Sequence, residues 1–121
     1  MDEGWLSAQS RGDSMVITIR GDLDIVTSPQ LDTCLSDAEG THDRIILDLS
    51  GVDFLDTSAL AVIVGHWKSV EAGGGMLALA GARYRYTKTL WITGLADKLT
   101  LYDTVEQGLQ EQARSGRRPT S

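Results

Sequence analysis

Hydrophobic and polar residues alternate along the segment SMVITIRGDLD, residues 14–24. Met15, Ile17 and Ile19 fall on one side of an extended chain and the residues between them on the other, which is the period of a β-strand. We expect the preceding WLSAQS to pair with this strand as a hairpin that turns at the RGD of residues 11–13. Short apolar runs predict three further strands, at residues 44–49, 76–81 and 99–102.

Helical spacing predicts four helices between and after these strands. Ser28 stands as a cap before Pro29, a residue favoured at the first helical position, and Gly40 marks the end of that helix. A second helix begins at Ser58, carries its apolar residues on one face, and stops at the glycines of residues 73–75. The other two helices are predicted at residues 83–93 and 104–114. This alternation predicts an α/β fold: one domain with a mostly parallel mixed sheet, an N-terminal hairpin and about four helices packed on the sheet.

Length and composition are those of a single domain with one core. The chain has 121 residues, of which 41% are hydrophobic and 23% charged. We expect the domain to cover residues 5–112 and a flexible basic tail to cover residues 113–121. The basic residues of that tail are Arg114, Arg117 and Arg118. Core positions are expected to include Cys34, Trp67 and Trp91.

The chain is acidic, with a net charge of −6 and a pI near 4.7. Such a chain repels the phosphate backbone of nucleic acids, so we expect no nucleic-acid partner and favour a basic or mixed-charge protein partner. The longest apolar run, residues 59–65, is far shorter than the roughly 20 residues of a membrane span. The first residues, MDEGWLSAQ, lack the basic start and apolar core of a signal peptide. We therefore expect a cytoplasmic protein with no membrane partner.

Side chains that commonly carry catalysis or bind metals are few and far apart. Cys34, His42 and His66 provide neither a disulfide framework nor zinc-ligand spacing. Ser58 and His66 lie on one predicted helix, about 12 Å apart along its axis, which excludes direct proton transfer between them. The glycines at residues 73–75 end a helix, whereas a phosphate-binding loop opens one. We expect no enzymatic activity, no metal and no cofactor.

A hydroxyl-bearing segment follows the central strand, where the chain is expected to turn at SGVDF before the second helix. Asp56, Thr57 and Ser58 are all residue types that cap helix N-termini. Phosphorylation of Ser58 would add about −1.5 to −2 charges and three acceptor oxygens at the helix start. The helix dipole would favour that phosphate, whereas Asp56 and the acidic pair Asp22 and Asp24 would oppose it. From these residues alone, Ser58 is either such a switch or a plain helix cap.

Three segments of the chain resemble the STAS domain, and within it the small anti-sigma factor antagonists that are phosphorylated on a serine. They are GDLDIVTSPQL, RIILDLSGVDFLDTSAL and LAVIVGHWKSVEAGGGMLALAG, within a resemblance that covers residues 14–108. In that family the second hydroxyl residue of the motif matched by DTSAL is the phosphoacceptor. The resemblance thus assigns this role to Ser58, with Thr57 as a minor acceptor. Ala59 stands where the family usually has glycine, and its methyl group is expected to narrow access to the neighbouring hydroxyl.

The resemblance also implies a function in transcription regulation. The unphosphorylated protein would bind an anti-sigma factor that is also a serine kinase, and would thereby free a sigma factor. Phosphorylation would end the binding, and a metal-dependent serine phosphatase would reset the switch. ATP would belong to the kinase. The residues expected to face the partner are Asp22, Asp24, Ser28, Asp56, Thr57, Ser58 and Ala59.

Two alternatives remain open from the sequence. The first is a response-regulator receiver domain, with Asp48 as the phosphoacceptor and Asp22 and Asp24 as its metal-binding acids. Against it, no lysine clearly ends the last strand. In structural terms, Asp48 would instead cap a turn at the strand end, and Asp24 would support its own loop. The second alternative lies within the STAS family: a scaffold or sensor module that binds a different regulatory kinase, or a domain whose serine is never modified.

Overall fold

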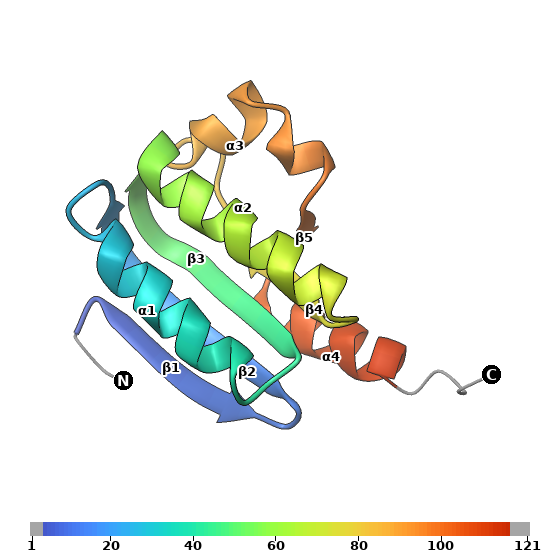
Figure 1. Ribbon diagram of the computed structural model, residues 1–121. Helices are drawn as coiled ribbons and strands as arrows, with labels where there is room; N and C mark the ends of the chain where they lie inside the picture. The colour runs from blue at the N-terminus through green and yellow to red at the C-terminus, as the bar shows by residue number, and fades with distance from the viewer. Residues whose placement is uncertain (1–3, 117–121) are drawn as a thin grey trace.

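Residues 4–116 of the computed structural model are described here, and within them five strands form one sheet (Figure 1). The strands lie side by side in chain order, with β1 antiparallel to β2 and all other neighbours parallel. The predicted hairpin and mostly parallel sheet are confirmed. The strands are β1 (Leu6–Arg11), β2 (Ser14–Leu23), β3 (Arg44–Leu55), β4 (Met76–Ala80) and β5 (Thr100–Tyr102).

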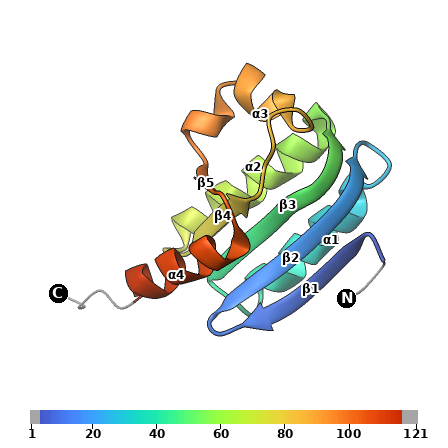
Figure 2. The same ribbon diagram turned by 180° about the vertical axis from the view of Figure 1, so that it is seen from behind.

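Helices cover both faces of this sheet. α1 and α2 lie side by side over one face, and α4 crosses the other face, as the view from behind shows (Figure 2). A short α3 and a single 3-10 turn, η1, connect β4 to β5. The helices are α1 (Ser28–Glu39), α2 (Thr57–Ala72), α3 (Lys88–Ile92), η1 (Leu95–Asp97) and α4 (Val105–Gly116). The predicted α/β domain with about four helices is confirmed.

The core lies mainly between the sheet and the pair α1 and α2. Leucine and isoleucine side chains of β2, β3 and β4 alternate into it, and Cys34 is buried among them as expected. A smaller apolar layer lies under α4, where Val105 and Leu109 pack on the sheet. There Gln112 is fully buried and accepts a hydrogen bond from the Ser14 hydroxyl at 2.8 Å while its amide donates to the Ile45 carbonyl at 3.1 Å. These two bonds fix α4 to the sheet.

The expected turn at SGVDF is wrong, because β3 continues through it to Leu55. Residues 51–55 pair with the second half of β2, and the register shifts where Arg20 meets Gly51. A Cβ atom at Gly51 would lie 3.1 Å from the Arg20 Cγ, so this position favours glycine for the close approach of the strands. Pairing with β2 therefore overrides the local turn preference.

Three other boundaries differ from the sequence-based expectation. The N-cap of α1 is Thr27, one residue before Ser28. The helix expected at residues 83–93 is only α3, because residues 84–86 form a turn. Trp91, expected in the core, is exposed, whereas Trp67 packs against the core. The last helix continues beyond residue 112 to Gly116, and the expected tail lies outside the described residues from residue 117 onwards.

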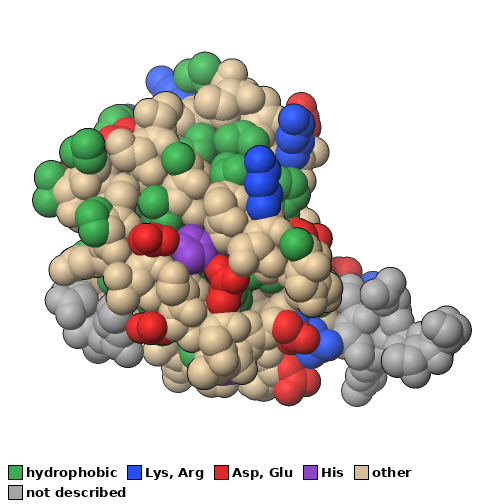
Figure 3. All heavy atoms as spheres, in the orientation of Figure 1, with side chains coloured by type: hydrophobic (Ala, Val, Ile, Leu, Met, Phe, Trp, Pro, Cys, Tyr) green, Lys and Arg blue, Asp and Glu red, His purple; other side chains and the backbone are tan. Residues whose placement is uncertain are grey.

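His66 links the two helices that cover the core. Its Nε2 lies 2.5 Å from the Asp32 carboxylate, and its Nδ1 contacts Glu39, which also accepts a bond from the Ser69 hydroxyl at 2.8 Å. Figure 3 shows an imidazole flanked by acidic side chains on this face. Burial lowers the pKa of His66, but the hydrogen bonds and charges of Glu39 and Asp32 outweigh burial and raise the pKa above its usual value. The imidazolium, which donates from both nitrogens, is the form that fits.

The raised pKa of His66 makes the stability of the α1–α2 pair pH-dependent. The folded protein binds this proton more tightly than the unfolded chain, so the stabilisation is complete below pH 6 and is lost as pH rises through the raised pKa. We expect His66→Gln to lower the free energy of unfolding by about 1 kcal/mol at pH 5.5, and by less at pH 9. Urea denaturation at both pH values measures this difference. His42→Gln is the control, because its imidazole contacts the hydroxyls of Ser10 and Thr41; an equal loss at both pH values for His66→Gln would contradict the prediction.

Gly75 is required at the start of β4. A Cβ atom there would lie 2.3 Å from the Asp43 carbonyl oxygen and 2.9 Å from a Val70 methyl group. We expect Gly75→Ala to destabilise the fold by about 2 kcal/mol or more. Gly65→Ala is the matched control, because this helical glycine faces open space and alanine there should stabilise by about 0.5–1 kcal/mol. Chemical denaturation of both variants should give opposite signs, and equal signs would contradict the prediction.

Candidate functional site

The ends of β2 and β3 bring the candidate residues together at one end of the molecule. The last paired residues are Leu23 and Leu55, and the Asp56 N–H then donates to the Leu23 carbonyl at 3.0 Å. The β2–α1 loop, residues 24–27, therefore lies beside the first turn of α2. This end of the molecule therefore brings together the predicted partner-facing residues of β2, of this loop and of the start of α2.

The cap of α2 is Asp56, and the plain-cap interpretation of Ser58 is wrong. Asp56 has an extended backbone, and its carboxylate accepts a hydrogen bond from the Ala59 N–H at 3.1 Å. Thr57 begins the helix and Ser58 follows it within the first turn. The Ser58 side chain is half-buried, and its hydroxyl has no hydrogen-bond partner among residues 4–116. This hydroxyl therefore keeps its hydrogen-bonding capacity for a group outside the described residues.

The other predicted partner-facing residues differ in how much surface they offer. Asp22 and Thr57 are exposed. Asp24 is occupied within its loop, where its carboxylate accepts bonds from the Val26 N–H at 3.0 Å and the Thr27 N–H at 3.2 Å. This confirms the structural interpretation of Asp24 as a support for its own loop.

Two of the predicted residues are buried. Ser28 donates its hydroxyl to the Asp24 carbonyl at 2.6 Å and contributes little surface. Ala59 is fully buried in the core. Its methyl group therefore faces away from solvent and does not narrow access to Ser58, contrary to the expectation from the sequence.

Exposed hydrophobic residues surround the start of α2, and the sequence analysis missed them. On one side, the β2–α1 loop exposes Ile25 and Val26 by 72% and 79%, and the end of β3 exposes half of Phe54. On the other side, α3 exposes 75% of Ile92 and 36% of Trp91. The start of α3 is held here by the Thr89 hydroxyl, which donates to the Leu55 carbonyl at 2.7 Å. Figure 3 shows hydrophobic side chains on the surface at this end.

Apolar side chains of this size, exposed together, mark an interaction surface. A signal was present in the sequence: the dipeptide Ile25-Val26 lies inside a polar loop, where no core face requires it. Acidic residues lie among these side chains, namely Asp22, Asp53 and Asp56.

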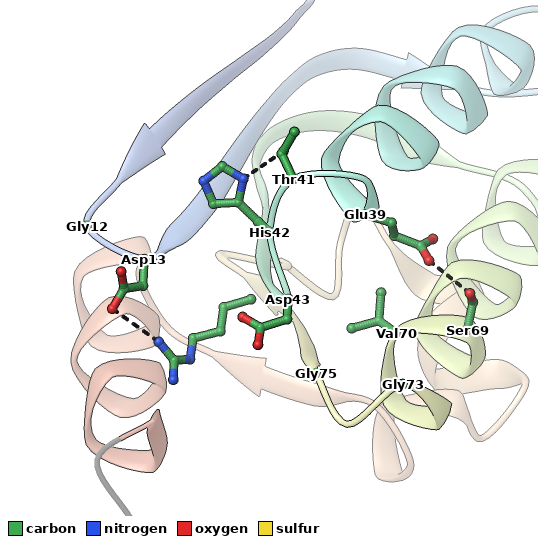
Figure 4. Close-up of a pocket in the computed structure, with 11 residues that line it drawn as sticks. Gly12, Asp13, Glu39, Thr41, His42, Asp43, Ser69, Val70, Gly73 and Gly75 are labelled. Atoms are coloured by element: carbon green, nitrogen blue, oxygen red, sulfur yellow. Dashed lines mark hydrogen bonds and ion pairs between the residues drawn. The ribbon is translucent and has the colours of Figure 1, made fainter.

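Another hollow, at the end of the molecule opposite Ser58, is lined by residues such as Gly12, Thr41 and Gly75 (Figure 4). It has a volume of about 660 Å³ and is formed by the β1–β2 turn and by the loops that precede β3 and β4. Asp13 pairs there with Arg44 at 3.4 Å, and His42 contacts the Thr41 hydroxyl at 2.8 Å. These groups are paired with one another, and the hollow shares no residue with the Ser58 end.

The receiver-domain alternative is wrong. Asp48 lies in the middle of β3 and accepts hydrogen bonds from the backbone and hydroxyl of Ser50. Asp22 pairs with Phe54, about 20 Å further along the strand, so the acids do not meet. No metal-binding group of three or more acidic, histidine or cysteine residues occurs in the described part of the chain. The strand order also differs from the 2-1-3-4-5 order of flavodoxin-like folds.

None of the helices within residues 4–116 is long and apolar enough to cross a membrane. This finding agrees with the short apolar runs of the sequence.

Comparison with known proteins gives consistent similarities. The sequence matches the STAS domain over residues 6–108. An anti-sigma-B factor antagonist of Staphylococcus epidermidis is 30% identical over 92 residues, which cover 74% of this chain and 84% of that protein. A homologue of an anti-sigma factor antagonist, from Thermotoga neapolitana, is 39% identical over 70 residues, or 58% of this chain. The match covers 62% of that protein, and a second match covers 65% of an anti-sigma factor antagonist from Thermotoga maritima. The chain therefore spans less than two thirds of the length of these two relatives.

Solved structures share the fold. The anti-sigma factor antagonist SpoIIAA in its unphosphorylated form superposes with a TM-score of 0.72 at 20% identity, covering 90% of this chain and 97% of that one. The phosphorylated form of SpoIIAA, from Bacillus, gives a TM-score of 0.69 at 22% identity, covering 88% and 97%. At this identity the likeness concerns the fold alone. The extent of the sequence match decides the family: the chain belongs to the STAS-domain family of anti-sigma factor antagonists.

Proposed function

We propose that this chain is a phosphorylation-controlled switch that binds an anti-sigma factor through the end of the molecule that carries Ser58, and so frees a sigma factor for transcription. The observation that carries the proposal is the Ser58 hydroxyl: it lies in the first turn of α2 without a hydrogen-bond partner in residues 4–116, among exposed apolar side chains. An anti-sigma factor with serine kinase activity would bind there and transfer the γ-phosphoryl group of its own ATP to this hydroxyl.

Phosphorylation would act on binding through local electrostatics. The α2 N-terminus tolerates a phosphate in water, because its free N–H groups and dipole favour an anion. In a complex, however, the phosphate would be buried beside Asp56 and between the apolar side chains of the loop and α3. Burying about −2 charges without a paired cation costs far more free energy than burying the neutral hydroxyl. The phosphorylated form would therefore dissociate.

The comparisons support this proposal. SpoIIAA, which has the same fold, was solved in both an unphosphorylated and a phosphorylated form. Reversal of the switch requires a serine phosphatase, and a metal-dependent enzyme of that kind is the partner we propose for the phosphorylated form. On this proposal the chain contributes only the acceptor hydroxyl and its docking surface.

Substitutions at Ser58 test the switch. We expect Ser58→Ala to bind the anti-sigma factor like the wild type but to resist phosphorylation, and Ser58→Asp to bind at least about tenfold more weakly, because it buries a charge in the interface. The measurement is retention of the anti-sigma factor from lysate of the source organism, identified by mass spectrometry, followed by titration of the purified factor. Ser36→Asp, at an exposed position of α1, is the control. A Ser58→Asp protein that binds the anti-sigma factor as tightly as the wild type does would contradict the proposal.

The exposed loop residues test the docking surface separately. Val26 is 79% exposed, so Val26→Asp should leave the thermal midpoint of unfolding nearly unchanged. In the interface the same change removes an apolar contact and buries a carboxylate, so binding of the purified anti-sigma factor should weaken by about tenfold or more. Thr33→Asp, at an exposed position on α1, is the matched control. Unchanged affinity of Val26→Asp would show that this loop lies outside the interface.

A further inference from the structure

A basic and aromatic surface lies next to the Ser58 end, on the segment that joins β4 to α3 and on α3 itself. The basic patch, as we call it, comprises Arg83, Tyr84, Arg85, Lys88, Trp91 and Ile92, all of them exposed. Neither the chemistry proposed for Ser58 nor the core requires the basic side chains of Arg85 and Lys88 here. Arginine, tyrosine and tryptophan are the residue types that carry most of the binding energy at protein interfaces.

The patch is held in a defined shape by contacts within it. The rings of Tyr84 and Trp91 meet edge to face with centroids 5.4 Å apart, and the Arg83 guanidinium lies 4.5 Å from the Tyr86 ring centre. Arg83 also donates to the Ser50 carbonyl at 2.8 Å, which ties the segment to β3. Side chains that are ordered before binding lose less entropy in a complex.

The charge of the patch is opposite to that of the chain. Residues 83–98 contain four of the 11 Lys and Arg residues but one of the 17 Asp and Glu residues, in a chain of net charge −6. The amino groups and guanidinium groups of Arg85 and Lys88 have no ion-pair partner among residues 4–116. This arrangement attracts an acidic partner surface, whereas the Asp22 and Asp56 side of the same end repels one.

A small hollow accompanies the patch. It has a volume of about 280 Å³ and lies between α3 and the carboxyl ends of β4 and β5, with Arg83, Trp91, Tyr102 and Asp103 among its walls. A hollow with aromatic walls beside a guanidinium can take one side chain of a docked segment and exclude water from its contacts.

We propose that the basic patch is a second contact surface for the anti-sigma factor. It takes an acidic segment of that protein across α3, with an uncharged side chain of the segment in the hollow at Trp91, because Asp103 also lines that hollow. The inference rests on the proposed function and extends it. Two observations select this occupant: the positive charge of the patch, and its continuity with the Ser58 end through Trp91 and Ile92, which belong to both surfaces. Nucleic acid fits less well, because the patch has three basic residues and the chain as a whole, with a net charge of −6, repels a long phosphate backbone.

Charge reversal at the patch is the test. The double variant Arg85→Glu/Lys88→Glu changes two exposed side chains, and circular dichroism establishes that it folds with an unchanged thermal midpoint. The probe is the purified anti-sigma factor, titrated at low and high salt. We expect the double variant to bind about tenfold or more weakly at low salt, with the difference shrinking at high salt as the charges are screened. Lys68→Glu, an exposed basic residue of α2, is the control that should bind like the wild type.

Ser58→Asp in the same assay separates the two proposals. If Ser58→Asp loses binding while the double variant binds like the wild type, the patch is not an interface and the inference fails, although the proposed function stands. If the wild type itself does not bind the anti-sigma factor, both fail. A labelled DNA duplex provides the third arm: binding of DNA to the wild type that the double variant abolishes would also overturn the inference.

Trp91 gives an optical readout of binding at the place where the two surfaces meet. Its indole is 36% exposed, and insertion of an acidic segment beside it should remove water and shift its fluorescence emission to shorter wavelength on addition of the anti-sigma factor. Trp91→Phe should abolish that shift while Trp5 and Trp67 still report the fold. A shift of equal size in Trp91→Phe would place the contact elsewhere and overturn the inference.

Discussion

The parallel pairing of β2 with β3 is the interaction on which the rest of the structure depends. It runs from Ser14 opposite Arg44 to Leu23 opposite Leu55, whereas β3 pairs with β4 only as far as Asp48. The second half of β3 therefore projects beyond β4, and in the described part of the chain β2 alone pairs with it. This projection carries the chain to Asp56 and sets the start of α2 beside the β2–α1 loop.

The projecting half of β3 has an open edge, and the β4–α3 segment covers it. Unpaired carbonyls on a strand edge need partners, which here come from side chains: Arg83 donates to Ser50, and Thr89 donates to Leu55. The same two contacts place α3 against the start of α2. One structural requirement, closing an edge, thus determines which apolar side chains of α3 lie beside the start of α2 and places the basic side chains on the segment before them.

Local patterns in the sequence were sufficient for most of the fold and for the position of Ser58. The hairpin, the buried runs of β3 and β4 and the start of α2 follow from periodicity and capping residues, which act over a few neighbours. The segment at residues 50–54 was mispredicted because its glycine, serine and aspartates favour turns locally, whereas pairing with β2, remote in sequence, holds it extended. The docking surface was missed for a related reason. Whether Val26 is exposed depends on the tertiary position of its loop, and its hydrophobicity alone suggests the opposite.

The packing of α2 decides how a phosphate on Ser58 could act. Asp56 caps the helix, and the residues that follow Ser58, Ala59 and Leu60, are buried together with Ile63. Moving this turn would empty core positions, at a cost of several kcal/mol. The free energy of the phosphorylated protein is therefore lower when the phosphate stays in solvent at an unmoved helix end than when the site refolds. On the proposed function, the switch then lies in the surface itself: the same rigid end is apolar and partly acidic before modification and carries an added dianion afterwards, so the partner loses affinity while the fold stays as it was.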